Sequence, residues 1–239
     1  MSNDSSHLGN AASGSARAEL RPGRLPIDPE AWQFVIGAAM SGVGAALLAR
    51  YLLGNPLLAA GCLAFGVVTA LGCAAFFRDP QRDVPQDPAL VLSPADGRIT
   101  AVDHSPEKTT ITIFLSVLNV HINRVPVSGR VTRVQHRPGK FLAAYRPEVP
   151  AVNEANDLVL ETEHGTVQTI QIAGLIARRI VCRARVGDVL RAGDRFGLIR
   201  FGSCTRVDLP GDAVPTVRVG DKVQGGTSVI ARWSGTANS

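Results

Sequence analysis

The stretch 94-PADGRIT-100 returns as 126-PVSGRVT-132, and this repetition indicates how the larger part of the chain is built. Each copy places a Pro/Gly turn directly before a short run of residues that favour β-strands. Pro and Gly recur in both copies, so we interpret them as framework. Asp96 is replaced by Ser128 in the second copy. The turn therefore does not require the acid, which modestly favours a separate role for Asp96.

A second repeat lies further along the chain, where 185-RVGD-188 returns as 218-RVGD-221, each copy followed by another glycine, Gly193 or Gly226. Residues 91–232 around these repeats contain short runs rich in Val, Ile and Thr, separated by Gly, Pro and Asp. Such spacing is typical of β-strands. We therefore predict a mainly β domain with internal repeats, a barrel-sandwich hybrid of two similar halves. Fold alone does not fix function.

Two apolar stretches precede this domain, from about Trp32 to Leu53 and from about Leu57 to Phe77. Each is close to the roughly 20 residues that a membrane-spanning helix needs, and Asn55-Pro56 between them predicts a turn. We expect an N-terminal hydrophobic helical hairpin. A cleaved signal peptide fits less well, because the apolar region is too long and starts too late. A buried helical pair in a soluble core remains the alternative.

The charges around the hairpin predict its orientation in a membrane. Arginines precede it and Arg78 and Arg82 follow it, so both flanks are basic, which places them on the cytoplasmic side of a cell membrane. Arg50 near the tip requires either snorkelling or a hairpin that only partly crosses. The expected domains are a disordered polar lead over residues 1–30, the membrane-associated hairpin over 31–77 and a β-rich catalytic domain over 78–239.

Composition excludes several classes of function. The 239 residues carry a net charge of +5, but no run of Lys and Arg interleaves with aromatic residues, so nucleic acid is a poor candidate partner. An anionic bilayer surface fits the charge better. The four cysteines form no CxxC pair, and the sequence has no HxH or HExxH motif. We therefore expect neither a metal site nor a disulfide framework.

The Gly202-Ser203 pair follows two strand-like stretches, 171-QIAGLIARRIVC-182 and 196-FGLIRF-201. We expect Ser203 on a turn beside a strand end, where a glycine lets a hydroxyl approach its carbonyl. On its own such a pair is typical of an ordinary turn.

The order of motifs along the chain resembles that of phosphatidylserine decarboxylase proenzymes, in their short, membrane-anchored bacterial form. After the apolar hairpin, the motifs are 76-FFRDPQRDVP-85, 93-SPADGRI-99, 115-LSVLNVHINRVPVSG-129, 171-QIAGLIARRIVC-182 and 195-RFGLIRFGS-203. The resemblance extends from the hairpin to the C-terminus. Several motifs in the same order make it specific, although each alone would be weak.

The resemblance implies a self-processing, pyruvoyl-dependent carboxy-lyase. Such proenzymes cut themselves before the serine of the Gly-Ser motif, here between Gly202 and Ser203, giving a large chain (1–202) and a small chain (203–239) that stay together as a heterodimer. Ser203 becomes a covalent pyruvoyl group, which forms a Schiff base with phosphatidylserine and accepts electrons as carbon dioxide leaves. Phosphatidylethanolamine is the product. Whether the heterodimers assemble further is left open.

The resemblance also assigns roles to two other residues. Asp96 matches the acid of the family's Asp-His-Ser self-cleavage arrangement, and His121 matches an active-site histidine that handles protons near neutral pH. Without the resemblance, His121 would be interpreted as a hydrogen-bonded residue at a strand end.

The sequence departs from the family pattern at three positions. Arg124 stands where longer members have a second histidine, which leaves open whether His121 serves cleavage, decarboxylation or both. Ala155 stands where relatives usually have arginine. Cys204 follows Ser203 where relatives often have Ser, Thr or Arg, and we give it little weight as a nucleophile because the chemistry needs the residue at the new N-terminus.

Two other functions compete with the decarboxylase. A membrane-tethered β-hybrid binding module would stay whole and carry no carbonyl group. A membrane-anchored metallopeptidase of similar architecture would need clustered ligands that the sequence does not offer. For the decarboxylase, basic residues around Phe141, Leu142 and Tyr145 are candidates for lipid headgroup contacts; these are Arg137, Lys140 and Arg146.

Overall fold

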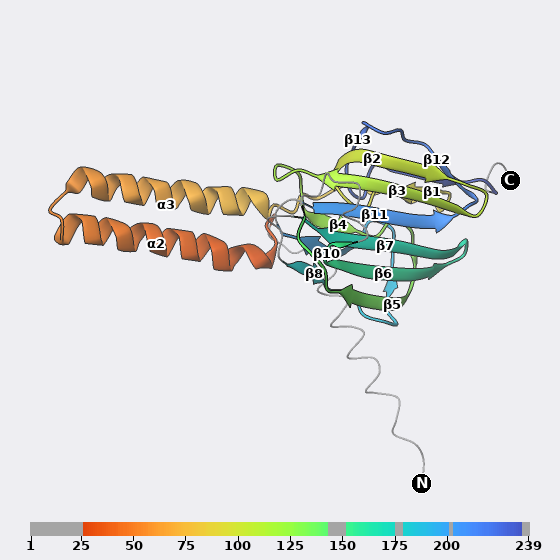
Figure 1. The fold of residues 1–239 in the computed structure, drawn as a ribbon, viewed down its shortest axis with the longest axis horizontal. Coiled ribbons are helices and arrows are strands. Elements are labelled where there is room, and N and C mark those ends of the chain that lie inside the picture. The colour runs from red at the N-terminus through yellow and green to blue at the C-terminus, as the bar shows by residue number, and fades with distance from the viewer. Residues whose placement is uncertain (1–25, 143–151, 175–178, 201–202, 236–239) are drawn as a thin grey trace, which may run out of the picture. The chain divides into compact units, whose positions relative to one another are not determined.

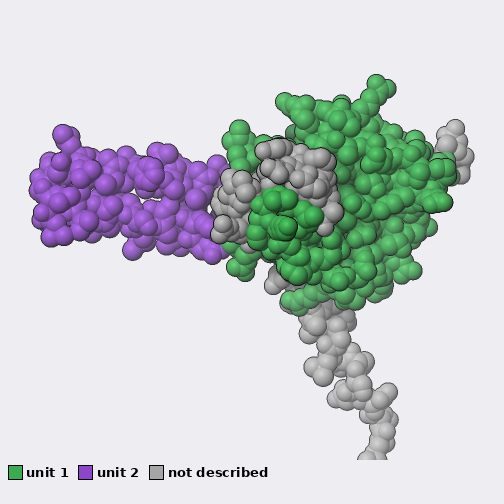
Figure 2. All heavy atoms as spheres, viewed as in Figure 1, with its two compact units in different colours: residues 1–22, 82–239 green, residues 23–81 purple. Residues whose placement is uncertain are grey.

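The computed structural model describes residues 26–142, 152–174, 179–200 and 203–235 (Figure 1). Most of the predicted polar lead, and Arg146 and Gly202 among the predicted functional residues, lie outside this part of the chain. The chain divides into two compact units, residues 23–81 and residues 82–239 (Figure 2). The two units are described separately.

The first unit is a helical hairpin. A 3-10 turn, η1 (Pro29–Ala31), leads into α2 (Trp32–Tyr51), and α3 (Pro56–Phe76) follows after a short turn. Asn55-Pro56, where the sequence predicts a turn, lies where the turn between the helices meets α3. Asn55 caps α3 through a hydrogen bond from Leu58 N to Asn55 Oδ1 of 3.0 Å, and Pro56 takes the first helical position, where its missing N–H costs nothing.

The two helices pack through glycines at one point of very close approach. A Cβ atom added to Gly42 would lie 2.7 Å from Gly66 Cα, and one added to Gly66 would lie 2.6 Å from Gly42 Cα. At the base, Asp28 N donates to Phe77 O over 2.9 Å, and Asp79 N donates to Pro26 O over 2.7 Å. The hairpin is therefore tied together at its middle and at its base.

The remaining helix surface is apolar and largely exposed. Phe65 is 74% exposed and Leu57 is 85% exposed, and both helices are long and apolar enough to cross a membrane. A helix in a soluble core would bury such side chains. The hairpin is therefore compatible with membrane association and does not resemble a soluble core pair.

The second unit is built almost entirely of antiparallel strands. In chain order these are β1 (Leu90–Leu92), β2 (Gly97–His104), β3 (Lys108–Leu115), β4 (Ile122–Arg124), β5 (Gly129–Arg137), β6 (Ala155–Thr162), β7 (Gly165–Ala173), β8 (Ile180–Cys182), β9 (Val189–Leu190), β10 (Arg195–Ile199), β11 (Ser203–Pro210), β12 (Ala213–Pro215), β13 (Lys222–Val223) and β14 (Val229–Trp233).

Eight strands form one curled sheet in the order β13-β2-β3-β11-β7-β6-β5-β9, and two small sheets, β1-β14-β12 and β4-β10-β8, complete the unit (Figure 1). The inward side chains form the core, with Ile111, Ile113 and Val207 completely buried. Burial of each such side chain contributes roughly 1.5–3 kcal/mol. The predicted fold class, a mainly β barrel-sandwich hybrid preceded by a hydrophobic hairpin, is confirmed.

The first sequence repeat forms the start of two equivalent strands. Gly97 begins β2 and Gly129 begins β5. A Cβ atom on Gly97 would collide with the carbonyl oxygen of Phe114, and one on Gly129 would lie 2.6 Å from the carbonyl oxygen of Glu161. Both glycines are therefore required because a neighbouring strand passes too close for any side chain.

The second repeat forms two equivalent turns that bind the strands of the first. Arg185 N donates to Asp188 Oδ2, and the corresponding bond joins Arg218 N to Asp221 Oδ2, both over 2.8 Å. The middle glycine of each turn adopts a positive φ of 95° or 99°, a conformation that favours glycine.

Each of these turns is hydrogen-bonded to one strand of the first repeat. Gly187 N donates to Val131 O, and Gly220 N donates to Ile99 O. Val131 and Ile99 occupy the same position in the two copies of the first repeat. One copy of the first repeat and one copy of the second therefore form a unit of a strand and the turn bound to it. This unit occurs twice in the fold.

We expect Gly97→Ala to destabilise the β unit strongly, because the new methyl group meets a strand backbone that cannot move without breaking its ladder. Overpacking of this kind typically costs about 1–3 kcal/mol, occasionally more. The measurement is urea unfolding of the full chain in detergent, in a Ser203→Ala background. Gly235→Ala is the matched control, because nothing lies within 4 Å of its Cβ position. Equal unfolding midpoints for the two variants would contradict the close approach at Gly97.

Candidate active site

Ser203 is the first residue of β11, which lies between the long strands β3 and β7 in the middle of the eight-stranded sheet. It lies opposite Leu115 of β3 and Ala173 of β7. Side chains alternate along a strand, and Thr205 and Val207 are buried in the interior, so Ser203 points inward with them. Its side chain is completely buried, and Ser203 Oγ has no hydrogen-bond partner among the described residues. A buried hydroxyl without a partner is costly, and such exceptions call for a functional explanation.

His121 comes directly before β4 and is only 2% exposed. Its ring Nδ1 lies 2.9 Å from the carbonyl oxygen of Asn119. A carbonyl oxygen can only accept a hydrogen bond, so Nδ1 carries the proton and the lone pair of the neutral ring is on Nε2. The contact with Asn119 therefore selects the tautomer that carries its proton on Nδ1.

The topology brings His121 and Ser203 to the same end of the unit. Leu115, which lies opposite Ser203, is the last residue of β3, and the chain reaches His121 six residues later. From the other side, Ile199 N donates to His121 O over 3.3 Å, and Ile199 is four residues before Ser203. Both connections place the two residues predicted from the sequence at the entrance to β11.

Asp96 is buried at this end of the sheet in an ion pair with Arg82. Its carboxylate lies 2.8 Å from the Arg82 guanidinium and accepts a hydrogen bond from Gly225 N over 2.9 Å. Arg98, two residues later, pairs with Phe114 of β3. Asp96 thus lies across β3 from Ser203, and within the described chain its hydrogen bonds go to Arg82 and Gly225 rather than to His121.

The corresponding residue of the second repeat makes the same backbone contact. Ser128 Oγ accepts a hydrogen bond from Ala192 N over 3.0 Å, as Asp96 does from Gly225 N. The framework therefore requires a side-chain oxygen at this position, although not an acid. Only the Asp96 copy adds an ion pair, made by Arg82 of the motif that follows the hairpin. The sequence identified that motif but did not indicate this contact.

Arg124, the residue in the place of the second histidine, is buried between Gly193 and Gly226, the glycines that follow the two turns of the second repeat. Its Nη1 donates to Gly193 O over 3.0 Å, and a Cβ atom on Gly226 would lie 2.6 Å from Arg124 Cδ. Arg124 therefore joins the two halves of the unit. Ala155 is also buried and packs with Ile170 and Ile172 in an apolar cluster, where no charge is needed.

Cys204 points away from Ser203, into that apolar cluster on the other face of the sheet. Burial raises the pKa of Cys204 to about 12, so its thiol stays protonated at neutral pH. A protonated thiol is a poor nucleophile, in agreement with the little weight given to Cys204. In the part of the chain that the structure describes, no cluster of His, Cys, Asp or Glu could hold a metal ion.

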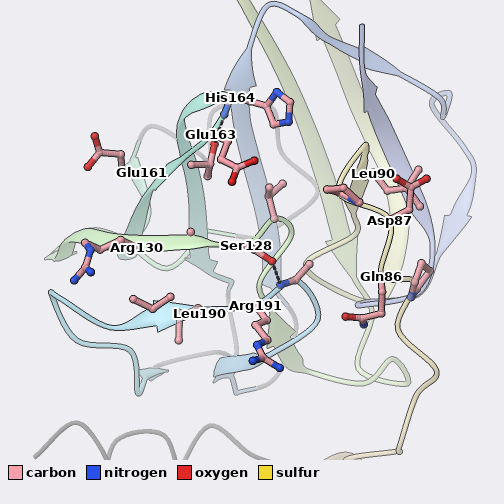
Figure 3. A pocket seen from close by; sticks show the side chains of 17 residues that line it. Gln86, Asp87, Leu90, Ser128, Arg130, Glu161, Glu163, His164, Leu190 and Arg191 are labelled. Carbon is pink, nitrogen blue, oxygen red and sulfur yellow. Dashed lines mark hydrogen bonds between the residues drawn. The ribbon is translucent and has the colours of Figure 1, made fainter. Parts of the chain in front are cut away.

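A cavity of about 630 Å³ lies at the opposite ends of β6 and β7, away from Ser203 (Figure 3). Its lining includes Ser128, the repeat counterpart of Asp96, together with Arg130 and Glu161. None of the predicted site residues lines it. Arg137 and Lys140, two of the expected headgroup contacts, do not line it either, and Arg137 is held by Asp157 through two hydrogen bonds of 2.9 and 3.1 Å.

Comparison with known proteins supports one family. The family model described as phosphatidylserine decarboxylase matches residues 70–231. A phosphatidylserine decarboxylase proenzyme of Symbiobacterium thermophilum is 48% identical over 211 residues, which cover 85% of this chain and 94% of that protein. The proenzyme of Nocardia farcinica is 47% identical over 180 residues (71% and 76%), and that of Geotalea uraniireducens is 44% identical over 218 residues (88% and 98%).

Proposed function

Because the chain belongs to the phosphatidylserine decarboxylase family of carboxy-lyases, we propose that it becomes active by cutting itself between Gly202 and Ser203. The mature enzyme then converts phosphatidylserine to phosphatidylethanolamine and carbon dioxide. The observation that carries the proposal is Ser203 Oγ, a completely buried hydroxyl without a partner among the described residues at the start of the central strand. A hydroxyl in this state is suited to attack the carbonyl that precedes it.

The cleavage chemistry needs only groups that the chain supplies and one molecule of water. Ser203 Oγ loses its proton and attacks the Gly202 carbonyl carbon, and the peptide C–N bond breaks as an ester forms and the Ser203 nitrogen gains a proton. Removal of the Ser203 α-proton then breaks the Cβ–O bond and releases Gly202 as a carboxylate. Water converts the remaining dehydroalanine to a pyruvoyl group and ammonia.

His121 is the proposed proton carrier for these steps. Nδ1 is committed to Asn119 O, so Nε2 is the atom that takes the hydroxyl proton, and a hydroxyl becomes a good nucleophile only when a base does so. Asp96 is the third residue of the proposed arrangement, and its carboxylate is fixed by Arg82.

The residues present fit the pyruvoyl group that the family implies, because Ser203 is both its source and buried from bulk water. When formed, this group would supply the electron-accepting carbonyl for decarboxylation. The surrounding chain excludes water through Leu115 and Ala173, which are both completely buried on either side of Ser203. His121 would hold a proton at Nε2 for delivery to the product.

The two chains would remain together after cleavage. The small chain (203–239) would contribute β11 between β3 and β7, β13 beside β2, and β14 beside β1. The β11 ladders begin at Ser203 and continue to Pro210 beside β3 and to Asp208 beside β7, so most of their length lies beyond the bond that is cut. The proposed product is therefore a heterodimer in which the central strand belongs to the small chain.

We further propose that the hairpin crosses the membrane and returns, with the catalytic unit on the cytoplasmic side. Helices of 20 and 21 residues are about 30 Å long, which matches the hydrocarbon core of a bilayer. Trp32 and Tyr51, at opposite ends of α2, are exposed and suited to the two interfaces. Arg50 next to Tyr51 then reaches the far interface by snorkelling.

Intact mass of the purified protein tests self-processing. We expect two chains that end and begin at Gly202 and Ser203, with the small chain carrying an N-terminal carbonyl in place of the serine amine. Ser203→Ala should stay whole, because no hydroxyl is available. Cys204→Ala is the matched control and should be cut normally, since its thiol is protonated and faces away. An uncut wild-type chain would overturn the proposal and favour the binding-module alternative.

Substitution of His121 tests its role and separates its two possible tasks. We expect His121→Ala to slow processing about 10²-fold or more, the usual range for loss of a general base. His136→Ala is the control, because His136 is exposed. Measuring chain cleavage and, on whatever fraction is cut, carbon dioxide release from phosphatidylserine vesicles shows which step needs the ring. Normal rates for both steps in His121→Ala would remove His121 from the site.

Labelling of single cysteines tests the membrane arrangement. In a background with the four native cysteines replaced by alanine, we expect Leu53→Cys in the tip to react with a membrane-impermeant maleimide in intact spheroplasts. Asp83→Cys after the hairpin should react only in inverted vesicles. Labelling of both positions from the same side would show that the hairpin enters the bilayer without crossing it.

A further inference from the structure

A row of buried polar side chains, here called the amide chain, connects four strands next to the candidate site. It consists of Asn156 on β6, Gln171 on β7, Asn123 on β4 and Thr205 on β11. Asn156 Nδ2 donates to Gln171 Oε1 over 3.1 Å, Gln171 Nε2 donates to Asn123 Oδ1 over 2.9 Å, and Asn123 Nδ2 donates to Thr205 Oγ1 over 3.1 Å. Every amide therefore donates in the direction of Thr205.

All four side chains are buried, and three of them are completely buried. Burying an amide is unfavourable unless its hydrogen bonds are made, and apolar residues would fill the same volume at no such cost. The amide chain satisfies its members only when all four strands are in place. The amide chain therefore contributes more to fixing the relative positions of the four strands than to the stability of the fold.

The amide chain joins two sheets that share no backbone ladder within the described residues. Asn123 belongs to the small sheet β4-β10-β8, whereas Thr205, Gln171 and Asn156 belong to the eight-stranded sheet. Backbone hydrogen bonds fix each strand against its neighbours within a sheet, whereas apolar packing, such as that of Phe196 with Leu158 and Leu160, holds the two sheets against one another. The side-chain bonds from Asn123 to Thr205 and Gln171 add directional polar links across the boundary between the sheets.

The joined positions lie directly beside the candidate catalytic residues. Asn123 follows His121 by two residues, and Thr205 follows Ser203 by two residues on the same face of β11. The small sheet carries the proton acceptor and the large sheet carries the nucleophile. The distance between the two groups is thus set across the sheet boundary that the Asn123–Thr205 bond closes.

We propose that the amide chain is a positioning network for self-cleavage, with Asn123 and Thr205 as the positioning residues that hold His121 and Ser203 in reacting geometry. The inference rests on the proposed self-processing. A displacement of about 1 Å between reacting groups can cost about 10²-fold in rate. Loss of one bond in the amide chain therefore affects cleavage far more than it affects folding.

The test compares matched hydroxyl deletions near to and far from the site. Thr205→Val removes the acceptor with little change in shape, and Thr205→Ser keeps it. Thr109→Val is the distant control. The Thr109 hydroxyl is equally buried and donates to Ala213 O over 2.7 Å, but Thr109 lies opposite Leu209, at the far end of β3 from Leu115 and Ser203.

The readout is the time course of conversion of the full chain to two chains during cell-free synthesis with phosphatidylcholine vesicles. Urea unfolding of each variant in a Ser203→Ala background reports stability separately. We expect Thr205→Val to slow cleavage about tenfold or more, Thr205→Ser to restore most of the rate, and Thr109→Val to cleave normally. The unfolding midpoints of Thr205→Val and Thr109→Val should fall by similar amounts.

Normal cleavage of Thr205→Val would overturn the inference, and so would equal slowing of Thr109→Val and Thr205→Val. In either case cleavage of the wild-type chain would leave the proposed function intact. A wild-type chain that stays whole would overturn the proposed function and the inference together.

Discussion

The backbone ladder on both sides of β11 is the constraint on which the rest of the structure depends. Ser203 has Leu115 opposite it on one side and Ala173 on the other, so the first residue of the strand cannot rotate without breaking two ladders. Its side chain is directed inward by the alternation that also buries Thr205 and Val207. The ladders thus keep the Ser203 hydroxyl in the interior, where it has no partner among the described residues.

The ladder positions Ser203 only relative to its own sheet. Other interactions position the remaining residues of the candidate site. His121 is brought in by the small sheet, Asp96 by the turn before β2, and each is fixed by a different type of interaction. A backbone carbonyl selects the tautomer of His121, and a guanidinium fixes Asp96. Arg124 adds a backbone bond across the two halves, from its N–H to Pro94 O. The candidate site thus combines long-range contacts that no single element could supply.

These long-range contacts also mark the limit of what the sequence could predict. The repeats predicted a two-fold β architecture correctly, because turns and strand starts depend on local residues such as Gly97 and Gly187. The hairpin followed from its apolar length and from Asn55. The partner of Asp96 and the amide chain did not follow, because Arg82, Asn123 and Thr205 meet only in the folded chain. The resemblance identified Ser203 and His121, but not what holds them.

The division of the repeats between the two proposed chains has a kinetic consequence. In one half of the fold, β2 precedes the Gly202-Ser203 bond in the sequence, and the turn that binds β2, residues 218–221, follows that bond. Before cleavage, folding brings these parts together within one molecule. After cleavage, an unfolded enzyme could recover only if two separate polypeptides met again, a second-order process that competes poorly with aggregation. The lifetime of the mature enzyme would then depend on how slowly it unfolds rather than on an equilibrium with the unfolded state.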